Sequence, residues 1–277
     1  MIQRLEFWLC HCEGCGFWQS RLGRPDQRLG DESAVVEEHR FAGLKALRAV
    51  NNEVILDLIE QFTPLAGMRL LDVGCAYGWF LAAAEQRQAV AVGIEPETAI
   101  AEKARQKGLR VKEGYFPGCL DPAESFDVVV FNDVLEHLPG IAQIFDACHA
   151  ALSKKGRLAV NVPVSSGLFF RLSVLLARLG YKKPLHRLWQ KGYRSPHLSY
   201  FNARNLEALA TRHGFSLLGR RPLKTLARQG LWARLNMDKS VPLPVAIPLY
   251  GGLLLLGPVL NALLPADLEV FLFERTD

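Results

Sequence analysis

LLDVGCAYGWF, residues 70–80, is the most informative segment of this 277-residue chain. An apolar run ends at Asp72 and is followed by a turn of small residues and then by the start of a helical pattern. Glycines at positions 74 and 78 suit this turn, because the backbone must bend sharply and a ligand must approach it without meeting a Cβ atom. The stretch therefore predicts a ligand site at the end of a buried strand. A turn that only packs the helix on the strand would show the same pattern.

The spacing of the glycines separates this turn from the cradle of dinucleotide enzymes. A pyrophosphate cradle has the pattern G-x-G-x-x-G. Here the turn is G-C-A-Y-G, with an acid two residues before its first glycine. The backbone N–H groups of the following helix would still face a ligand, so the spacing indicates a cofactor other than a dinucleotide.

Short apolar runs alternate with helical patterns on both sides of the motif, which predicts a parallel sheet covered on both faces. A leading helical stretch covers 33–62, and LEVFLFER at 268–275 predicts a last strand. We therefore predict an α/β fold with a Rossmann-like, doubly wound sheet of seven mostly parallel strands and an antiparallel last strand. The other predicted strands are 69–73, 89–94, 109–112, 126–131, 157–162 and 215–220, and the helices between them are 78–87, 97–107 and 140–152.

Polar residues fall at the ends of two further predicted strands. In VAVGIEPE, residues 90–97, Glu95 follows the glycine turn by roughly twenty residues, where a carboxylate can accept hydrogen bonds from both ribose hydroxyls. A solvated charge at a strand end is the alternative. In FDVVVFNDVLEHL, residues 126–138, the strand ends at Asn132 and Asp133, where the crevice of such a sheet lies.

In chain order these segments resemble the class I S-adenosylmethionine-dependent methyltransferases, in particular the O-methyltransferases of ubiquinone biosynthesis. The family's first motif, acid-x-Gly-x-Gly-x-Gly, is matched with Ala76 in place of the middle glycine, and its fourth motif, an acid followed by x-x-Glu-His, is matched by Asp133, Glu136 and His137. Residues 195–215 are similar to a later region of the family. The resemblance implies S-adenosylmethionine as the cofactor, bound by Asp72, Gly74, Cys75, Ala76, Gly78, Glu95, Pro96, Tyr115, Phe116, Asn132 and Asp133. Many relatives have an aspartate at the position of Tyr115, so backbone groups and apolar walls would hold the adenine here.

The cofactor's sulfonium carries an activated methyl group, so the protein must align an acceptor and, for a hydroxyl, remove a proton. His137 and His197 are candidate bases, because imidazole titrates near neutral pH. Either histidine could instead only hold its loop. A metal-dependent variant is the third interpretation: relatives that methylate ribose or sugar hydroxyls hold a divalent cation with such a motif and a later histidine, and Asp133, Glu136, His137 and His197 could do the same.

Residues 1–30 have little periodicity and contain Cys10, Cys12 and Cys15. The C-x-x-C-G knuckle at Cys12 and Cys15 resembles half of a zinc ribbon that precedes some methyltransferases, but a structural zinc needs four ligands. We therefore expect a degenerate remnant without metal, followed by a methyltransferase domain over 31–277 with its cofactor core at 67–163. The other cysteines lie in apolar contexts that suit a reducing compartment.

Charge divides the chain unevenly. Residues 1–146 contain 14 Lys and Arg against 22 Asp and Glu, a net charge of −8, whereas 147–237 contain 17 against one, a net charge of +16. Such segregation suits a negatively charged partner. Within 167–194 seven basic residues and no acid accompany large apolar residues, which is the pattern of a helix in a membrane interface, although a lid or a homodimer contact fits as well.

A second apolar insertion is uncharged from 240 to 266 and is long enough to span a bilayer. Its prolines and glycines argue against a straight spanning helix, and the strand at 268–275 must return to the sheet. We expect the two insertions, 164–200 and 222–266, to contact substrate, a membrane interface or a partner. No apolar run of signal-peptide length begins the chain, so a cytoplasmic location, peripheral to the inner face of a membrane, is expected.

The sequence therefore predicts a methyltransferase acting on a small-molecule or lipid-linked acceptor near an anionic membrane surface. The basic half would also permit an RNA substrate, but its long aliphatic runs argue against nucleic acid. A cofactor-binding scaffold without turnover is the non-enzymatic alternative. The patterns do not identify the acceptor or the atom that receives the methyl group.

Overall fold

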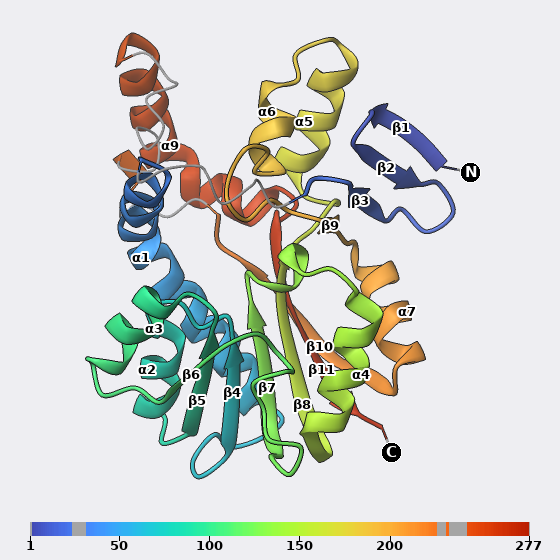
Figure 1. The fold of residues 1–277 in the computed structure, drawn as a ribbon. Helices are drawn as coiled ribbons and strands as arrows, with labels where there is room; N and C mark the ends of the chain where they lie inside the picture. Colours follow the sequence, from blue (N-terminus) through green and yellow to red (C-terminus); the bar gives the residue numbers. More distant parts are fainter. Residues whose placement is uncertain (1, 24–31, 226–230, 233–242, 277) are drawn as a thin grey trace.

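The computed structural model describes residues 2–23, 32–225, 231–232 and 243–276 of the chain, and therefore omits 226–230 and 233–242 of the predicted insertion. A seven-stranded sheet forms its centre, with the strand order β10-β11-β8-β7-β4-β5-β6 (Figure 1). Strands β4 to β8 pair in parallel, and β11 pairs antiparallel with both β8 and β10. The predicted fold class, including the antiparallel last strand, is confirmed. The sheet strands are β4 (Arg69–Val73), β5 (Val90–Glu95), β6 (Val111–Glu113), β7 (Phe126–Asn132), β8 (Leu152–Pro163), β10 (Phe215–Leu223) and β11 (Leu268–Arg275).

Helices cover both faces of the sheet, because its strands are apolar on both sides. On one face α1 and α2 pack on the sheet through a cluster that includes Ile55, Phe80 and Val130. On the other face α4 and α7 pack through a cluster that includes Phe145, Leu206 and Phe271. The covering helices are α1 (Glu32–Glu60), α2 (Trp79–Gln86), α3 (Thr98–Arg105), α4 (Ile141–Ala151) and α7 (Ala203–Arg212).

A second, four-stranded sheet includes the N-terminus. It has the order β1-β2-β3-β9, where β1 (Ile2–Glu6), β2 (Leu9–Cys12) and β3 (Trp18–Ser20) come from the first residues and β9 (Ser199–Tyr200) comes from the second half of the chain. An aromatic cluster that includes Trp8, Trp18 and Phe170 packs this sheet against α5 (Leu168–Arg178) and α6 (Lys183–Leu188). Sequence periodicity missed these strands, because strands of two to five residues are too short to display it.

The insertion after β10 contains α9 (Leu243–Leu263), although the prolines and glycines of this stretch argued against a straight spanning helix. Pro244 lies in its first turn, where backbone N–H groups have no intrahelical partner, whereas Pro248 and Pro258 lie farther along the helix. Both α9 and the α5–α6 pair stand above the edge at which the parallel strands end (Figure 1). None of the helices among the described residues is both long and apolar enough to cross a membrane.

Candidate active site

The glycine-rich turn follows β4 and is fixed to β5. The N–H groups of Gly74 and Cys75 both donate to the carbonyl of Ile94, at 2.8 and 3.0 Å. Gly74 has a φ of +72°, and a Cβ atom there would lie 2.7 Å from Val134. Ala76 has a φ of +46°, a left-handed conformation that glycine adopts more easily. This conformation explains why the family that the sequence resembles has glycine at the position of Ala76.

Glu95 joins the turn to the end of β5. Its two carboxylate oxygens accept hydrogen bonds from the N–H groups of Ala76 and Glu97, each at 3.0 Å. Burial raises the pKa of the Glu95 carboxyl, and the two N–H donors partly oppose that rise. The carboxylate thus lies at the carboxyl edge of the sheet, directly beside the glycine-rich turn, with Pro96 next to it.

Asp72 is the last polar group before the turn and is only 2% exposed. Burial, and then the nearby Glu95 charge, raise the pKa of the Asp72 carboxyl to about 8, while Arg48 opposes that rise. Cys75 is buried too, and burial raises the pKa of its thiol, so the thiol stays protonated. The fold therefore buries the Asp72 carboxyl close to the Glu95 carboxyl, and this arrangement costs the folded protein stability at neutral pH.

This cost gives a prediction for Asp72→Asn. The unfolded carboxyl titrates near its ordinary pKa of 3.8 and the folded one near 8. Between these values the folded state retains the proton, so the free energy of unfolding falls as pH rises, by up to about 1.4 kcal/mol per pH unit. Asparagine cannot titrate, so we expect the variant to lose this slope and to exceed the native protein in stability at pH 8. Urea unfolding of the cofactor-free protein at pH 5, 6, 7 and 8 measures the slope, and equal slopes would contradict the assignment.

A polar network occupies the end of β7, beside the turn. Asn161 donates to the side chains of Asn132, at 2.7 Å, and of Asp133, at 3.0 Å. From α1, Asn52 accepts a hydrogen bond from Asn132 at 3.1 Å, and Arg48 forms an ion pair with Asp133 at 3.5 Å. We did not predict Arg48, Asn52 or Asn161. The signal was available, because asparagines interrupt an apolar helix pattern at 52 and an apolar strand at 161.

Tyr115 and Phe116 lie farther along the same edge. They follow β6, whose Glu113 is the register partner of Glu95. Tyr115 is exposed and Phe116 is buried, with its ring against Phe131. The structure thus places both residues next to the end of β5, an arrangement that can form one wall of a nucleoside site.

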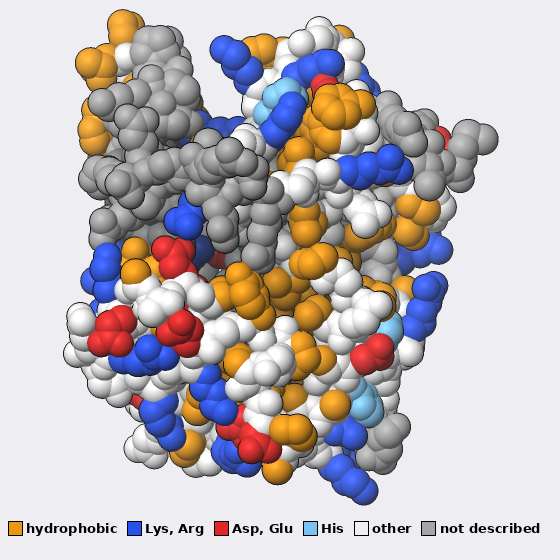
Figure 2. All heavy atoms as spheres, in the orientation of Figure 1, with side chains coloured by type: hydrophobic (Ala, Val, Ile, Leu, Met, Phe, Trp, Pro, Cys, Tyr) orange, Lys and Arg blue, Asp and Glu red, His pale blue; other side chains and the backbone are white. Residues whose placement is uncertain are grey.

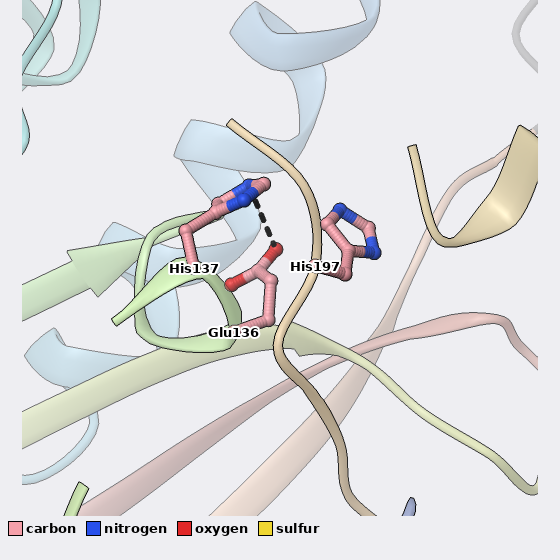
Figure 3. A group of neighbouring side chains, drawn as sticks. All are labelled: Glu136, His137 and His197. Carbon is pink, nitrogen blue, oxygen red and sulfur yellow. Dashed lines mark ion pairs between the residues drawn. The ribbon is translucent and has the colours of Figure 1, made fainter. Parts of the chain in front are cut away.

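Glu136, His137 and His197 form a compact group just beyond Asp133. One ligand-type atom from each of the three lies within 4.8 Å of the others (Figure 3). The first two residues belong to η1 (Leu135–His137), and His197 approaches from the segment before β9. The two imidazole rings contact each other edge to face, with their centres 4.6 Å apart. The structure therefore brings together the two histidines that the sequence placed sixty residues apart.

The surroundings of Glu136 and His137 define their states. His137 Nδ1 lies 3.1 Å from the carbonyl of Pro196, so Nδ1 carries the proton and donates it. His137 Nε2 is then the basic nitrogen, and it lies 4.0 Å from Glu136 Oε1. Burial, and then the Asp133 charge, raise the pKa of the Glu136 carboxyl well above its ordinary value. Within the described part of the chain, Glu136 Oε2 is buried without a hydrogen-bond partner.

The N-terminal cysteines lie apart from this site. Cys12 ends β2 and Cys15 is exposed in the following turn. Among the described residues, which include all six cysteines, the group at Glu136 is the one set of three or more metal-ligating side chains in reach of one another. The expectation that the N-terminal cysteines lack a zinc site stays a prediction.

These features define a Rossmann-like fold whose carboxyl edge carries a glycine-rich turn, a strand-end carboxylate and an acid–histidine group. A family model described as "Methyltransferase domain" matches residues 45–219. This chain belongs to that methyltransferase family, and the predicted class, an S-adenosylmethionine-dependent methyltransferase, is confirmed.

Curated relatives match part of the chain. A ubiquinone biosynthesis O-methyltransferase of Xylella fastidiosa (strain 9a5c) is 34% identical over 139 residues, which are 47% of this chain and 56% of that protein. A protein with the same name from Hahella chejuensis is 38% identical over 112 residues, 38% of this chain and 47% of that protein. The chain thus spans about half the length of the curated relatives that it matches.

Solved structures share the fold at low identity. A chain from the complex between the Haloferax volcanii Trm112 methyltransferase activator and the putative methyltransferase aligns with a TM-score of 0.60 at 12% identity, covering 89% of this chain and 98% of that one. The cyclopropane synthase MmaA2 from Mycobacterium tuberculosis aligns with a TM-score of 0.54 at 18% identity, covering 92% of this chain and 88% of that one. At such identities the likeness concerns the fold alone.

Proposed function

We propose that this protein transfers a methyl group from S-adenosylmethionine to a hydroxyl group of a small or lipid-linked acceptor at a membrane surface. The observation that carries the proposal is the group of Glu136, His137 and His197, which lies at the same sheet edge as the glycine-rich turn. The name of the ubiquinone biosynthesis relatives, which are O-methyltransferases, supports the choice of a hydroxyl.

The residues of the turn fit the cofactor. The cofactor could approach the backbone of the turn closely because residues 74 and 78 are glycines. Glu95 ends β5 where the ribose of the cofactor would lie. Asp72, Gly74, Cys75, Ala76, Gly78, Glu95, Pro96, Tyr115, Phe116, Asn132 and Asp133 would hold the cofactor, together with Arg48, whose cationic group suits the carboxylate of its methionine part. When bound, the cofactor supplies an activated methyl group.

His137 is proposed as the base that accepts the hydroxyl proton of the acceptor. Its Nδ1 donates to the Pro196 carbonyl, and this contact fixes the tautomer and leaves Nε2 to accept a proton. The partly exposed His137 ring can meet an acceptor, whereas His197 is only 7% exposed. His197 therefore serves in this proposal to orient the group.

A second candidate is metal-assisted transfer by the same group. A carboxylate and two imidazoles suit a divalent transition-metal cation, and Glu136 Oε2 is buried without a hydrogen-bond partner among the described residues. A cation would favour the ionised form of this carboxyl, which burial otherwise opposes. Activity after dialysis against EDTA, with and without added Mg²⁺, Mn²⁺ or Zn²⁺, separates this candidate from metal-free base catalysis.

Two helical segments support a membrane-bound acceptor. Leu172, Leu175 and Leu179 are exposed along one side of α5 and its end, and Arg171 and Arg178 share that region. Figure 2 shows apolar side chains next to Lys and Arg at the α5–α6 end, and further apolar side chains on the outer side of α9. The exposed apolar residues of α9 are Leu243, Ile247, Leu249, Leu255, Leu256 and Val259. This combination of basic and apolar groups favours an anionic lipid surface over RNA, which would require polar and stacking groups.

We expect Leu175→Glu to weaken binding to phosphatidylglycerol vesicles at least about tenfold, because a leucine side chain contributes about 1.5–3 kcal/mol when it leaves water and glutamate repels anionic lipid. Co-sedimentation measures the bound fraction. Val90→Glu is the matched control, because Val90 is also an exposed aliphatic residue but begins β5 at the opposite edge of the sheet. Equal binding of native protein to phosphatidylcholine and phosphatidylglycerol vesicles would contradict an anionic surface.

The test of the proposed activity is transfer of label from S-[methyl-³H]adenosylmethionine into the organic extract of membranes. Labelled lipid or quinol is expected with the native protein. Label in RNA instead of the extract would favour the nucleic-acid alternative, and cofactor binding without label in any fraction would favour a scaffold.

A further inference from the structure

The backbone before β9 is held between the N-terminal sheet and η1. The carbonyl of His197 accepts a hydrogen bond from Ser20 Oγ at 2.7 Å, and the carbonyl of Leu198 accepts one from Ser20 N at 2.8 Å. The N–H group of Leu198 donates to the carbonyl of Glu136 at 2.7 Å. Ser20 of β3 therefore binds His197 and Leu198, and Leu198 in turn binds Glu136 in the candidate catalytic loop.

The His197 ring is held as firmly as its backbone. Its Nε2 lies 2.7 Å from Gln190 Nε2, and its Nδ1 lies 3.2 Å from the hydroxyl of Tyr200, which donates to the carbonyl of Leu188 at 2.9 Å. Tyr200 belongs to β9 and pairs in register with Trp18 of β3. The ring contacts therefore depend on the same β3–β9 pairing as the backbone contacts.

We propose that Ser20 is a positioning residue, through which the N-terminal sheet sets the place of His197 beside Glu136 and His137. The expected effect of Ser20 on the rate rests on the proposed function, but its effect on the position of His197 does not. The sheet formed by β1 to β3 with β9 is then a working part of the catalytic unit and not a separate appendage.

The chemistry of the contact explains why a serine is needed. Ser20 is 6% exposed and lies beside an aromatic cluster, where the His197 carbonyl would otherwise find no water. Loss of the hydroxyl leaves this carbonyl without its donor, and the segment can relieve the loss only by moving. A shift of about 1 Å in a catalytic group can lower a rate about 10²-fold.

The experiment compares Ser20→Ala with Ser173→Ala in the full-length protein. Ser173 is an equally buried serine whose hydroxyl also donates to a carbonyl at 2.7 Å, but it does so within α5. We expect Ser20→Ala to lower kcat for label transfer about 10- to 100-fold, with the KM for S-adenosylmethionine unchanged within about twofold. Ser20→Thr, which keeps the hydroxyl, should recover most of the rate, and Ser173→Ala should retain it.

A spectroscopic measurement makes the test independent of the acceptor. In protein labelled with [¹³C]histidine, the Cε1–H resonance of His197, identified by its loss in His197→Gln, should shift and broaden in Ser20→Ala and not in Ser173→Ala. An unchanged resonance in a folded Ser20→Ala protein would overturn the positioning role. If Ser20→Ala does not fold, the near-isosteric Ser20→Cys takes its place. Native protein that shows no label transfer would refute the proposed function, while the resonance would still report on Ser20.

Discussion

Replacing His137 by glutamine lowers kcat for methyl transfer by about 10²- to 10⁴-fold, the usual contribution of a general base. Glutamine keeps a polar side chain of similar reach but cannot accept a proton near neutral pH. The KM for S-adenosylmethionine should change little, because the imidazole lies beyond the turn and β5 that would hold the cofactor. Initial rates of label transfer to the membrane extract measure both constants.

His213→Gln is the control for this exchange. His213 precedes β10 and binds Asp146 at 2.6 Å, at the edge of the sheet opposite the site.

The Glu136→Gln variant separates base catalysis by His137 from metal-assisted transfer. Burial raises the pKa of the Glu136 carboxyl and so favours its neutral form, which glutamine resembles, and in metal-free base catalysis the variant should retain the rate within a few-fold. If Glu136 instead binds a cation, the same exchange should abolish metal-dependent activity. A His137→Gln protein with native kcat would contradict both mechanisms.

The sequence predicted the sheet well because its strands carry strong, local signals. Residues 69–73 and 268–275 form β4 and β11 with the predicted bounds. Continuous apolar runs of this kind are favoured only between two layers of helices, so the pattern itself indicates a buried parallel sheet. The chain order of Asp72, Glu95 and Asp133 then placed all three residues at one edge, because parallel strands end on the same side.

The parts that the sequence did not predict depend on contacts between distant segments. Nothing near Ser20 indicates that it pairs with Leu198, since the pairing exists only after α5 and α6 bring the later segment back. Arg48 reaches Asp133 because α1 packs against β8, β10 and β11, a placement that no local pattern records. α9 was missed for a different reason: its prolines lower helix propensity, and although Pro244 lies in the first turn, where proline costs least, Pro248 and Pro258 lie within the helix.

Glu95→Ala is expected to weaken binding of S-adenosylmethionine at least tenfold, a loss of about 1.4 kcal/mol or more. In the proposed site the carboxylate would accept ribose hydroxyls, and in the structure it accepts hydrogen bonds from the N–H groups of Ala76 and Glu97. Its removal therefore deletes a ligand contact and loosens the turn. Calorimetry with S-adenosylmethionine and with S-adenosylhomocysteine measures the loss, which should be similar for both, because both molecules carry the same ribose.

Glu95→Gln distinguishes the two contributions. The amide oxygen can still accept from Ala76 or Glu97, so the turn keeps part of its support, while one of the two ribose acceptors is lost. We expect an intermediate loss of affinity. Glu113→Ala is the matched control, because Glu113 ends the adjacent strand in register with Glu95 but is more exposed and contacts Thr98 and Arg105. Native affinity in a folded Glu95→Ala protein would show that the cofactor lies elsewhere, since a nucleoside at this edge cannot avoid the end of β5.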